Sequence, residues 1–139
     1  MNFEILNTDK ESIDNLVKTF FALFTNKLQK PKLELIKLIC VENTFISRNS
    51  KNNTDIFNLE TFITPRIELL TNGSLINFEE KEISESTVIK ENIAQRVSLY
   101  QKEGILNGER FSETGNKLFQ FLKIDNTWKI CSIIWNDNK

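Results

Sequence analysis

The chain has 139 residues, and its 18 lysines and arginines nearly balance 19 aspartates and glutamates, for a formal net charge of −1. This length fits one domain over residues 1–139, and the 40% apolar residues, eleven phenylalanines among them, can build a core without a metal or a disulfide. A sequence pI of about 5.6 and the lack of a basic stripe exclude a nucleic-acid-binding protein.

The N-terminal segment and the two cysteines predict a cytoplasmic protein. The first residues are polar and acidic, unlike a secretory signal peptide, and no stretch reaches the roughly 18 apolar residues of a membrane span. Cys40 and Cys131 match no metal-binding or redox spacing, so we expect two free, buried thiols. We therefore expect no membrane, no metal and no cofactor as partners.

The first long element is predicted to be an amphipathic helix over residues 9–29. Thr8 and Glu11 form a capping box before it, in which each side chain can accept a hydrogen bond from the other residue's backbone N–H. Apolar residues then recur at helical spacing, and Pro31 ends the pattern.

The next segments alternate between short elements and loops. A short helix is predicted over 33–39 and an extended piece over 41–46. The polar stretch 47–55 is typical of an exposed loop. A second helical pattern covers about 57–71, and Pro65 inside it is expected to kink it or divide it.

From Ser74 onward the apolar period changes to two. Four strands are predicted, over residues 75–84, 87–102, 109–124 and 127–136. Residues 103–108 connect the second to the third, and residues 125–126 connect the third to the fourth. Helices followed by strands that are linked by hairpins indicate an α+β fold with an antiparallel sheet.

Both faces of this sheet carry apolar side chains. In the second strand Ile93 and Val97 point away from Ala94 and Tyr100, and a regular last strand would point Trp128 and Trp135 to opposite faces. An antiparallel sheet with one wet face would alternate cleanly between apolar and polar residues. We therefore expect a second subunit to cover the outer face, giving a homodimer through the sheet.

Three segments resemble the SnoaL-like branch of the nuclear-transport-factor-2-like superfamily, which has the cystatin-like fold. They include a Pro-Arg pair before a glycine turn, an Ala-x-Arg-x-Ser-x-Tyr strand and a closing strand with two tryptophans: 62–83, 93–111 and 115–137. The resemblance implies a cone-shaped domain whose N-terminal helices pack in the concave face of a curved antiparallel sheet. It also implies a pocket between helices and sheet and, commonly, dimerisation through the sheet.

The catalytic residues of the enzymes in that superfamily cannot be assigned to residues of this chain. The chain has no histidine, which excludes imidazole bases, histidine metal ligands and a His-Asp dehydratase pair. An isomerase would need a carboxylate base beside a neutral donor in an apolar site, and the only tyrosine available for this is Tyr100. No Asp-Arg-Asp arrangement of an epoxide hydrolase is visible.

The candidate site residues are polar or aromatic side chains from the second long helix and the strands: Arg66, Glu80, Glu82, Arg96, Ser98, Tyr100, Gln120 and Trp135. Alternation places several of them on one strand face. Two interpretations stay open. They form a buried ion-pair and hydrogen-bond set that fixes the sheet register or a polar dimer interface, or they contact a ligand. Arg66 pairs with a sheet carboxylate or orients an anionic ligand.

Three functions are compatible with the sequence. The first is a domain that binds a small apolar ligand in a pocket between helices and sheet. The second is an isomerase, cyclase or dehydratase that uses carboxylate and tyrosine acid–base chemistry. The third is a protein-interaction module that uses the sheet face.

Overall fold

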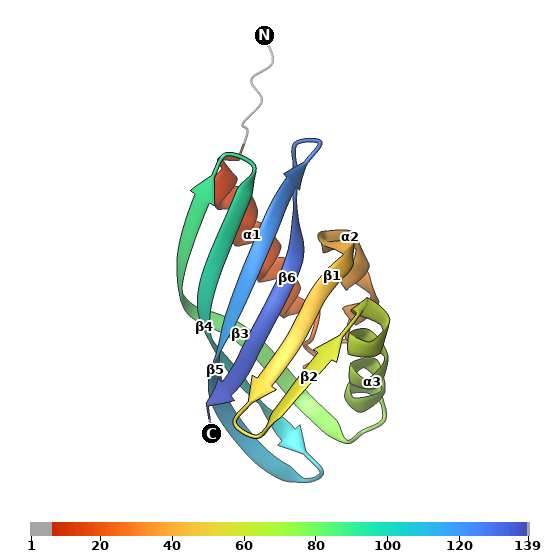
Figure 1. Cartoon of the computed structure of the whole chain (residues 1–139). Coiled ribbons are helices and arrows are strands. Elements are labelled where there is room, and N and C mark those ends of the chain that lie inside the picture. The colour runs from red at the N-terminus through yellow and green to blue at the C-terminus, as the bar shows by residue number, and fades with distance from the viewer. Residues whose placement is uncertain (1–6, 139) are drawn as a thin grey trace.

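The computed structural model describes residues 7–138, in which helices pack against one face of a six-stranded sheet (Figure 1). The elements in chain order are α1 (Asp9–Ala22), a 3₁₀ turn η1 (Leu33–Leu35), α2 (Ile36–Ile39), β1 (Cys40–Ser50), β2 (Asn53–Phe57), α3 (Leu59–Thr71), β3 (Leu75–Lys90), β4 (Ile93–Leu106), β5 (Glu109–Ile124) and β6 (Thr127–Asn138). The predicted α+β class, with N-terminal helices against a curved sheet, is confirmed.

The sheet order is β2-β1-β6-β5-β4-β3, so the strands from β3 to β6 form a meander. Every neighbouring pair is antiparallel except β1 and β6, which run parallel. The predicted turn at 85–86 is wrong, because β3 continues to Lys90 and turns at Glu91 and Asn92. Glu91 adopts a positive φ of 55° there.

The first helix is shorter than the sequence pattern predicts. It ends at Ala22 rather than residue 29, although its capping box at Thr8 and Glu11 is formed. The reason is Asn26, whose backbone N–H donates to the Phe78 carbonyl and whose Oδ1 accepts from the Phe78 N–H at 2.8 Å. These bonds fix residue 26 against β3, so the helix does not continue through it.

The predicted loop over 47–55 is wrong as well. These residues form most of a hairpin between β1 and β2, with Ser50 paired to Asn53. Arg48 and Asp55 face each other across it, 2.8 Å apart. The hairpin lies at the sheet edge, and its exposed side chains give a polar sequence that looks like a loop.

The second long helix, α3, runs without a break across Pro65. Asn58 and Thr61 cap its N-terminus reciprocally, each side chain accepting from the other residue's backbone N–H at 2.9 Å. The predicted division at Pro65 does not occur, and α3 packs its buried Phe62 and Ile63 towards the sheet.

The core lies between the helices and the inner face of the sheet. Aromatic rings connect the layers: Phe20 of α1 meets Phe119 of β5 edge-on at 5.3 Å, and Phe24 meets Phe62 of α3 at 6.0 Å. Such edge-to-face pairs add about 0.5–1.5 kcal/mol each beyond the burial of their area. Cys40 is buried, Cys131 is half-buried, and both are free thiols.

A bulge in β6 changes the prediction for the two tryptophans. Phe121 pairs with Ile130, but the next partner of Gln120 is Ser132, so the alternation of β6 shifts by one residue. Trp128 and Trp135 are therefore both buried, at 5% and 6% exposure. The expectation that they point to opposite faces is wrong.

The outer face of the sheet is exposed in the isolated chain. Val97, Leu118 and Ile134 are cross-strand neighbours on it and are 45%, 48% and 38% exposed. This confirms the predicted alternation in β4. In residues 7–138, no helix combines the length and apolar character needed to cross a membrane.

Candidate functional site

The polar side chains on the inner face of the sheet form two clusters rather than one. Glu80 and Glu82 share the inner face of β3 with their partners on β4, Lys102 and Tyr100. Arg96 lies further along β4, towards α1. One cluster is built around Arg96, and the other lines a pocket under α3.

The Arg96 cluster joins α1 to the sheet. The guanidinium of Arg96, only 3% exposed, contacts Glu82 Oε1 at 2.5 Å and Asp14 of α1 at 2.6 Å. Ser98 donates a hydrogen bond to the same Glu82 carboxylate. Burial disfavours the ionised forms, but the hydrogen bonds and opposite charges of the partners outweigh this effect. The pKa of Asp14 therefore lies below its usual value and that of Arg96 above it.

Lys10 completes this cluster, lying 2.7 Å from Asp14 and 2.8 Å from Glu85. Every ionised group named here has an opposite partner, which is the pattern of a structural ion-pair set. The first of the two interpretations, a register-fixing set, is therefore favoured for Glu82, Arg96 and Ser98.

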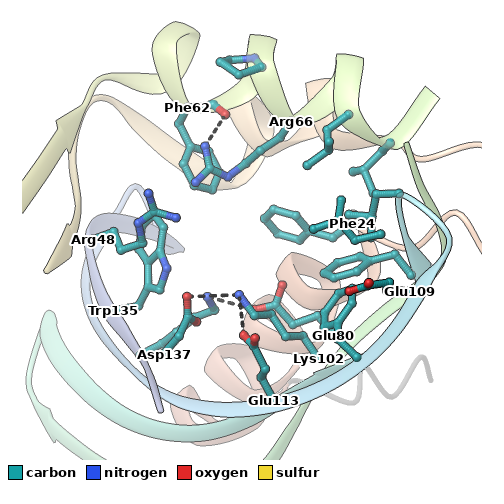
Figure 2. Close-up of a pocket in the computed structure, with 18 of the residues that line it drawn as sticks. Phe24, Arg48, Phe62, Arg66, Glu80, Lys102, Glu109, Glu113, Trp135 and Asp137 are labelled. Atoms are coloured by element: carbon teal, nitrogen blue, oxygen red, sulfur yellow. Dashed lines mark hydrogen bonds and ion pairs between the residues drawn. The ribbon is translucent and has the colours of Figure 1, made fainter. Parts of the chain in front are cut away.

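A pocket of about 530 Å³ lies between α3 and the part of the sheet that carries Glu80, Lys102 and Lys117 (Figure 2). Its apolar lining comes from the segment after α1, from α3 and from the strands, and half of it is aromatic: Phe24, Phe62, Pro65, Leu69, Leu70, Leu75, Phe78, Leu106, Phe111 and Trp135. Its charged lining comes from β1, α3 and the strands β3 to β6. The volume falls in the range of small-molecule sites.

Lys117 and Glu80 form a buried ion pair in the pocket wall. Their side chains are 7% and 6% exposed, and Lys117 Nζ lies 2.9 Å from Glu80 Oε1. The direction of approach is poor, however, and Glu80 Oε1 has no hydrogen-bond partner among residues 7–138. Burial lowers the pKa of Lys117, and the Glu80 charge opposes that shift.

Aromatic faces surround the Lys117 ammonium group. Its Nζ lies 4.1 Å from the ring centre of Tyr100 and 4.9 Å from that of Trp135. Cation–π attraction replaces part of the lost hydration at such distances. The lysine is thus held in the pocket wall rather than extended into solvent.

Tyr100 and Asp137 lie directly behind this pair. The Tyr100 hydroxyl donates to the Asp137 carboxylate and lies 3.1 Å from the Asn136 carbonyl oxygen. Burial and the Asp137 charge raise the pKa of Tyr100 far above its usual value. Lys102 lies 3.1 Å from Asp137, so the phenol proton is already engaged in a charged network.

Arg66 projects from α3 over the aromatic wall. Its guanidinium carbon lies 4.1 Å from the ring centre of Phe62 and 5.5 Å from that of Trp135, and it donates to the Phe62 carbonyl at 3.1 Å. Burial, with the like charge of Arg48, lowers the pKa of Arg66 to about 10. No carboxylate of residues 7–138 lies within 4.0 Å of it, so the predicted pairing with a sheet carboxylate is absent.

The structure therefore divides the predicted site residues. Arg66, Glu80 and Trp135 line the pocket, and Tyr100 supports it from behind through Lys117 and Asp137. Gln120 does not join either cluster, because it pairs with Gln95 and is exposed on the outer face.

The sequence reasoning missed Lys117 and Asp137. A lysine in a strand resembles a surface residue, but alternation along β5 places Lys117 on the same face as Phe119 and Phe121. This shared face with two phenylalanines was the feature of the sequence that could have identified Lys117 as an inward-facing residue. Among residues 7–138, no group of three or more cysteine, aspartate or glutamate side chains is placed to hold a metal ion.

The comparisons with known proteins show the fold. No protein-family model matches the chain, and no curated protein matches it. An NTF2-like protein of unknown function from Prochlorococcus sp. NATL2A has a TM-score of 0.74 and 13% identity, covering 96% of this chain and 95% of its own.

Two further solved structures are similar over nearly the same length. An uncharacterised protein with a cystatin-like fold from Caulobacter vibrioides has a TM-score of 0.71 and 9% identity, covering 94% of this chain and 89% of its own. A protein described as a candidate scytalone dehydratase, from Novosphingobium aromaticivorans, has a TM-score of 0.73 and 13% identity, covering 94% and 85%. At these identities the likeness concerns the fold.

Proposed function

Because the chain has the nuclear-transport-factor-2-like, cystatin-like fold, we propose that the pocket under α3 binds a small organic molecule. The observation that carries the proposal is the pocket of about 530 Å³ itself, with aromatic side chains in its walls and the buried ion pair of Glu80 and Lys117. The Lys117 ammonium group lies 2.9 Å from Glu80 Oε1 but is poorly aligned for a hydrogen bond, which a donor group of a ligand would supply.

Binding explains the polar groups better than acid–base catalysis does. An isomerase or dehydratase needs a donor that is free to give its proton to the substrate. Tyr100 is fully buried and donates to Asp137 instead. The likeness to a candidate scytalone dehydratase concerns the fold and does not support a shared proton-transfer step.

The test uses the fluorescent probe 1-anilinonaphthalene-8-sulfonate. Leu69 of α3 lines the pocket and is 37% exposed, whereas Leu38 of α2 is 64% exposed and does not line it. The wild type should give a saturable rise in probe fluorescence, which Leu69→Trp should weaken and Leu38→Trp should leave unchanged. Equal binding by all three proteins would contradict the proposal, provided near-ultraviolet circular dichroism shows that each is folded.

The outer face of the sheet supports a second role, as a surface for self-association. The cross-strand row of Val97, Leu118 and Ile134 is apolar and exposed, and the amides of Gln95 and Gln120 lie beside it. A contiguous apolar row of this kind on a strand face is typical of an interface. We propose that two copies of the chain pair through this face.

A further inference from the structure

The Arg66 guanidinium is an unmatched positive charge at one side of the pocket. A guanidinium has five N–H donors in a planar fork, and the Arg66 hydrogen bond within residues 7–138 goes to the Phe62 carbonyl. The ring of Phe62 covers one face of the group at 4.1 Å. A face covered by an aromatic ring fixes the plane of the fork, and the edge of the fork then remains for an acceptor.

The charge balance around Arg66 favours an anion there. Arg48 lies on the same side of the pocket (Figure 2), but it is matched by Asp55 at 2.8 Å. Lys117 is matched by Glu80 and Lys102 by Asp137, at 2.9 and 3.1 Å. Lys102 also lies 3.7 Å from Glu113. Arg110 lines the pocket as well but is exposed, so Arg66 is the half-buried cation of the lining that has no carboxylate within 4.0 Å in the described part of the chain.

A second polar group is needed further into the pocket. Glu80 Oε1 is buried in the wall and lacks a hydrogen bond, although Lys117 already balances its charge. A neutral donor such as a hydroxyl satisfies that oxygen without adding charge. A second ammonium group would be excessive, because it would leave the site with an unbalanced buried cation.

We propose that the ligand is a small hydroxy-substituted aromatic carboxylic acid. Its carboxylate binds the edge of the Arg66 guanidinium, its ring packs against the phenylalanines of the pocket, and its hydroxyl donates to Glu80. The Arg66 guanidinium fork at this wall matches the two oxygens of a single carboxylate. This inference rests on the proposed function, because it names the chemistry of the molecule that the same pocket binds.

Titration calorimetry with four naphthalene probes tests each part. The probes are 6-hydroxy-2-naphthoate, 2-naphthoate, its neutral amide 2-naphthamide, and 2-naphthol. A charge-assisted hydrogen bond is worth enough to change affinity about tenfold. We expect 2-naphthoate to bind about tenfold more tightly than 2-naphthamide, and 6-hydroxy-2-naphthoate to bind more tightly than 2-naphthoate.

Variants assign these differences to residues. Arg66→Met should remove the preference of naphthoate over naphthamide, while Arg110→Met, an exposed arginine at the same pocket, should keep it. Glu80→Gln should reduce the advantage of the hydroxyl group. If either variant fails to fold, the comparison among probes on the wild type still tests the inference, since it needs no substitution.

The outcomes separate the inference from the proposed function. If naphthoate and naphthamide bind the wild type equally, the pocket binds ligands but the inferred anion preference is overturned. If Arg110→Met removes the preference and Arg66→Met keeps it, the assignment to Arg66 is overturned. If none of the four probes binds, both the inference and the proposed pocket function fail.

Discussion

Tyr100 of β4 lies across the bare backbone of its direct cross-strand partner, Gly115 of β5. A Cβ atom at residue 115 would lie 2.6 Å from Cζ of Tyr100, closer than real contacts allow. The ring can cross β5 only because residue 115 has no side chain, and it then reaches Asp137 on β6. The missing side chain at residue 115 thus allows a contact between β4 and β6 across β5, behind the pocket.

Gly115→Ala should destabilise the protein strongly, because both the Tyr100 ring and the Asn136 carbonyl oxygen occupy the space of the new methyl group. We expect a loss of about 3 kcal/mol, at the upper end of overpacking effects. Gly73→Ala is the matched control, since nothing lies within 4 Å of its added Cβ and only its φ of +89° opposes the change. That control should lose about 1 kcal/mol. Urea unfolding measures both, and equal losses would contradict the packing described.

Arg96→Met should lower stability by about 2–3 kcal/mol, because it leaves Glu82 and Asp14 without the buried cation between them. The estimate is reduced from that for a fully buried pair, since the Asp14 side chain is 42% exposed. Arg110→Met, at an exposed position, is the control and should change little. A thermal melt that is unchanged for Arg96→Met would contradict the structural role of this cluster.

The sequence predicted the order of the elements well and their ends less well. Local signals such as the capping box at Thr8 and the strand alternation around Phe119 depend on neighbouring residues, so a pattern reveals them. The end of α1 depends on Asn26, which bonds to Leu70, Leu75 and Phe78 far along the chain. Contacts of this range leave no local pattern.

The site was predicted in part for the same reason. Strand parity placed several candidate residues on one strand face without showing which face lies inward, and the same rule applied to β5 would have found Lys117. Parity failed in β6, where the bulge beside Ser132 shifts the alternation and brings Trp135 to the helix side. The strand around this bulge contains no glycine or proline that would have indicated it in the sequence.

The free energy of unfolding should decrease at acidic pH, partly because the Asp137 carboxylate becomes protonated. Burial alone would raise the pKa of this carboxyl, but the hydrogen bond from Tyr100 and the charges of Lys102 and Lys117 outweigh it, so the folded-state pKa lies below the usual 3.8. The unfolded chain then takes up the proton first, and the stabilisation is present above about pH 4 and lost as the pH falls through the folded-state pKa.

Asp137→Asn tests this directly. The variant should be less stable than the wild type at pH 7, and the difference should shrink between pH 5 and pH 3, as measured by urea unfolding. Asp125→Asn, in the exposed turn between β5 and β6, should stay within about 0.5 kcal/mol of the wild type at both ends of that range. A difference for Asp137→Asn that does not depend on pH would contradict the assignment.

Leu118→Lys should convert the proposed dimer into a monomer, because Leu118 lies at the centre of the outer apolar row between Val97 and Ile134. A charge buried there would lose its hydration without a partner. Leu38→Lys, which changes a leucine that is 64% exposed on α2, should leave the dimer intact. Size-exclusion chromatography with light scattering measures the mass, and a wild-type monomer at high concentration would contradict the dimer.

The most direct test of ligand binding under α3 uses the protein's own tryptophans. Trp135 lines the pocket, whereas Trp128 lies at the other end of β6, where its Nε1 donates to Asp9 at 3.0 Å. In Trp128→Phe only Trp135 emits, and saturating 2-naphthamide, chosen because it is neutral, should change that emission with a single binding curve. In Trp135→Phe the emission of Trp128 should stay constant. A response from Trp128 alone, or from neither residue, would contradict binding in this pocket.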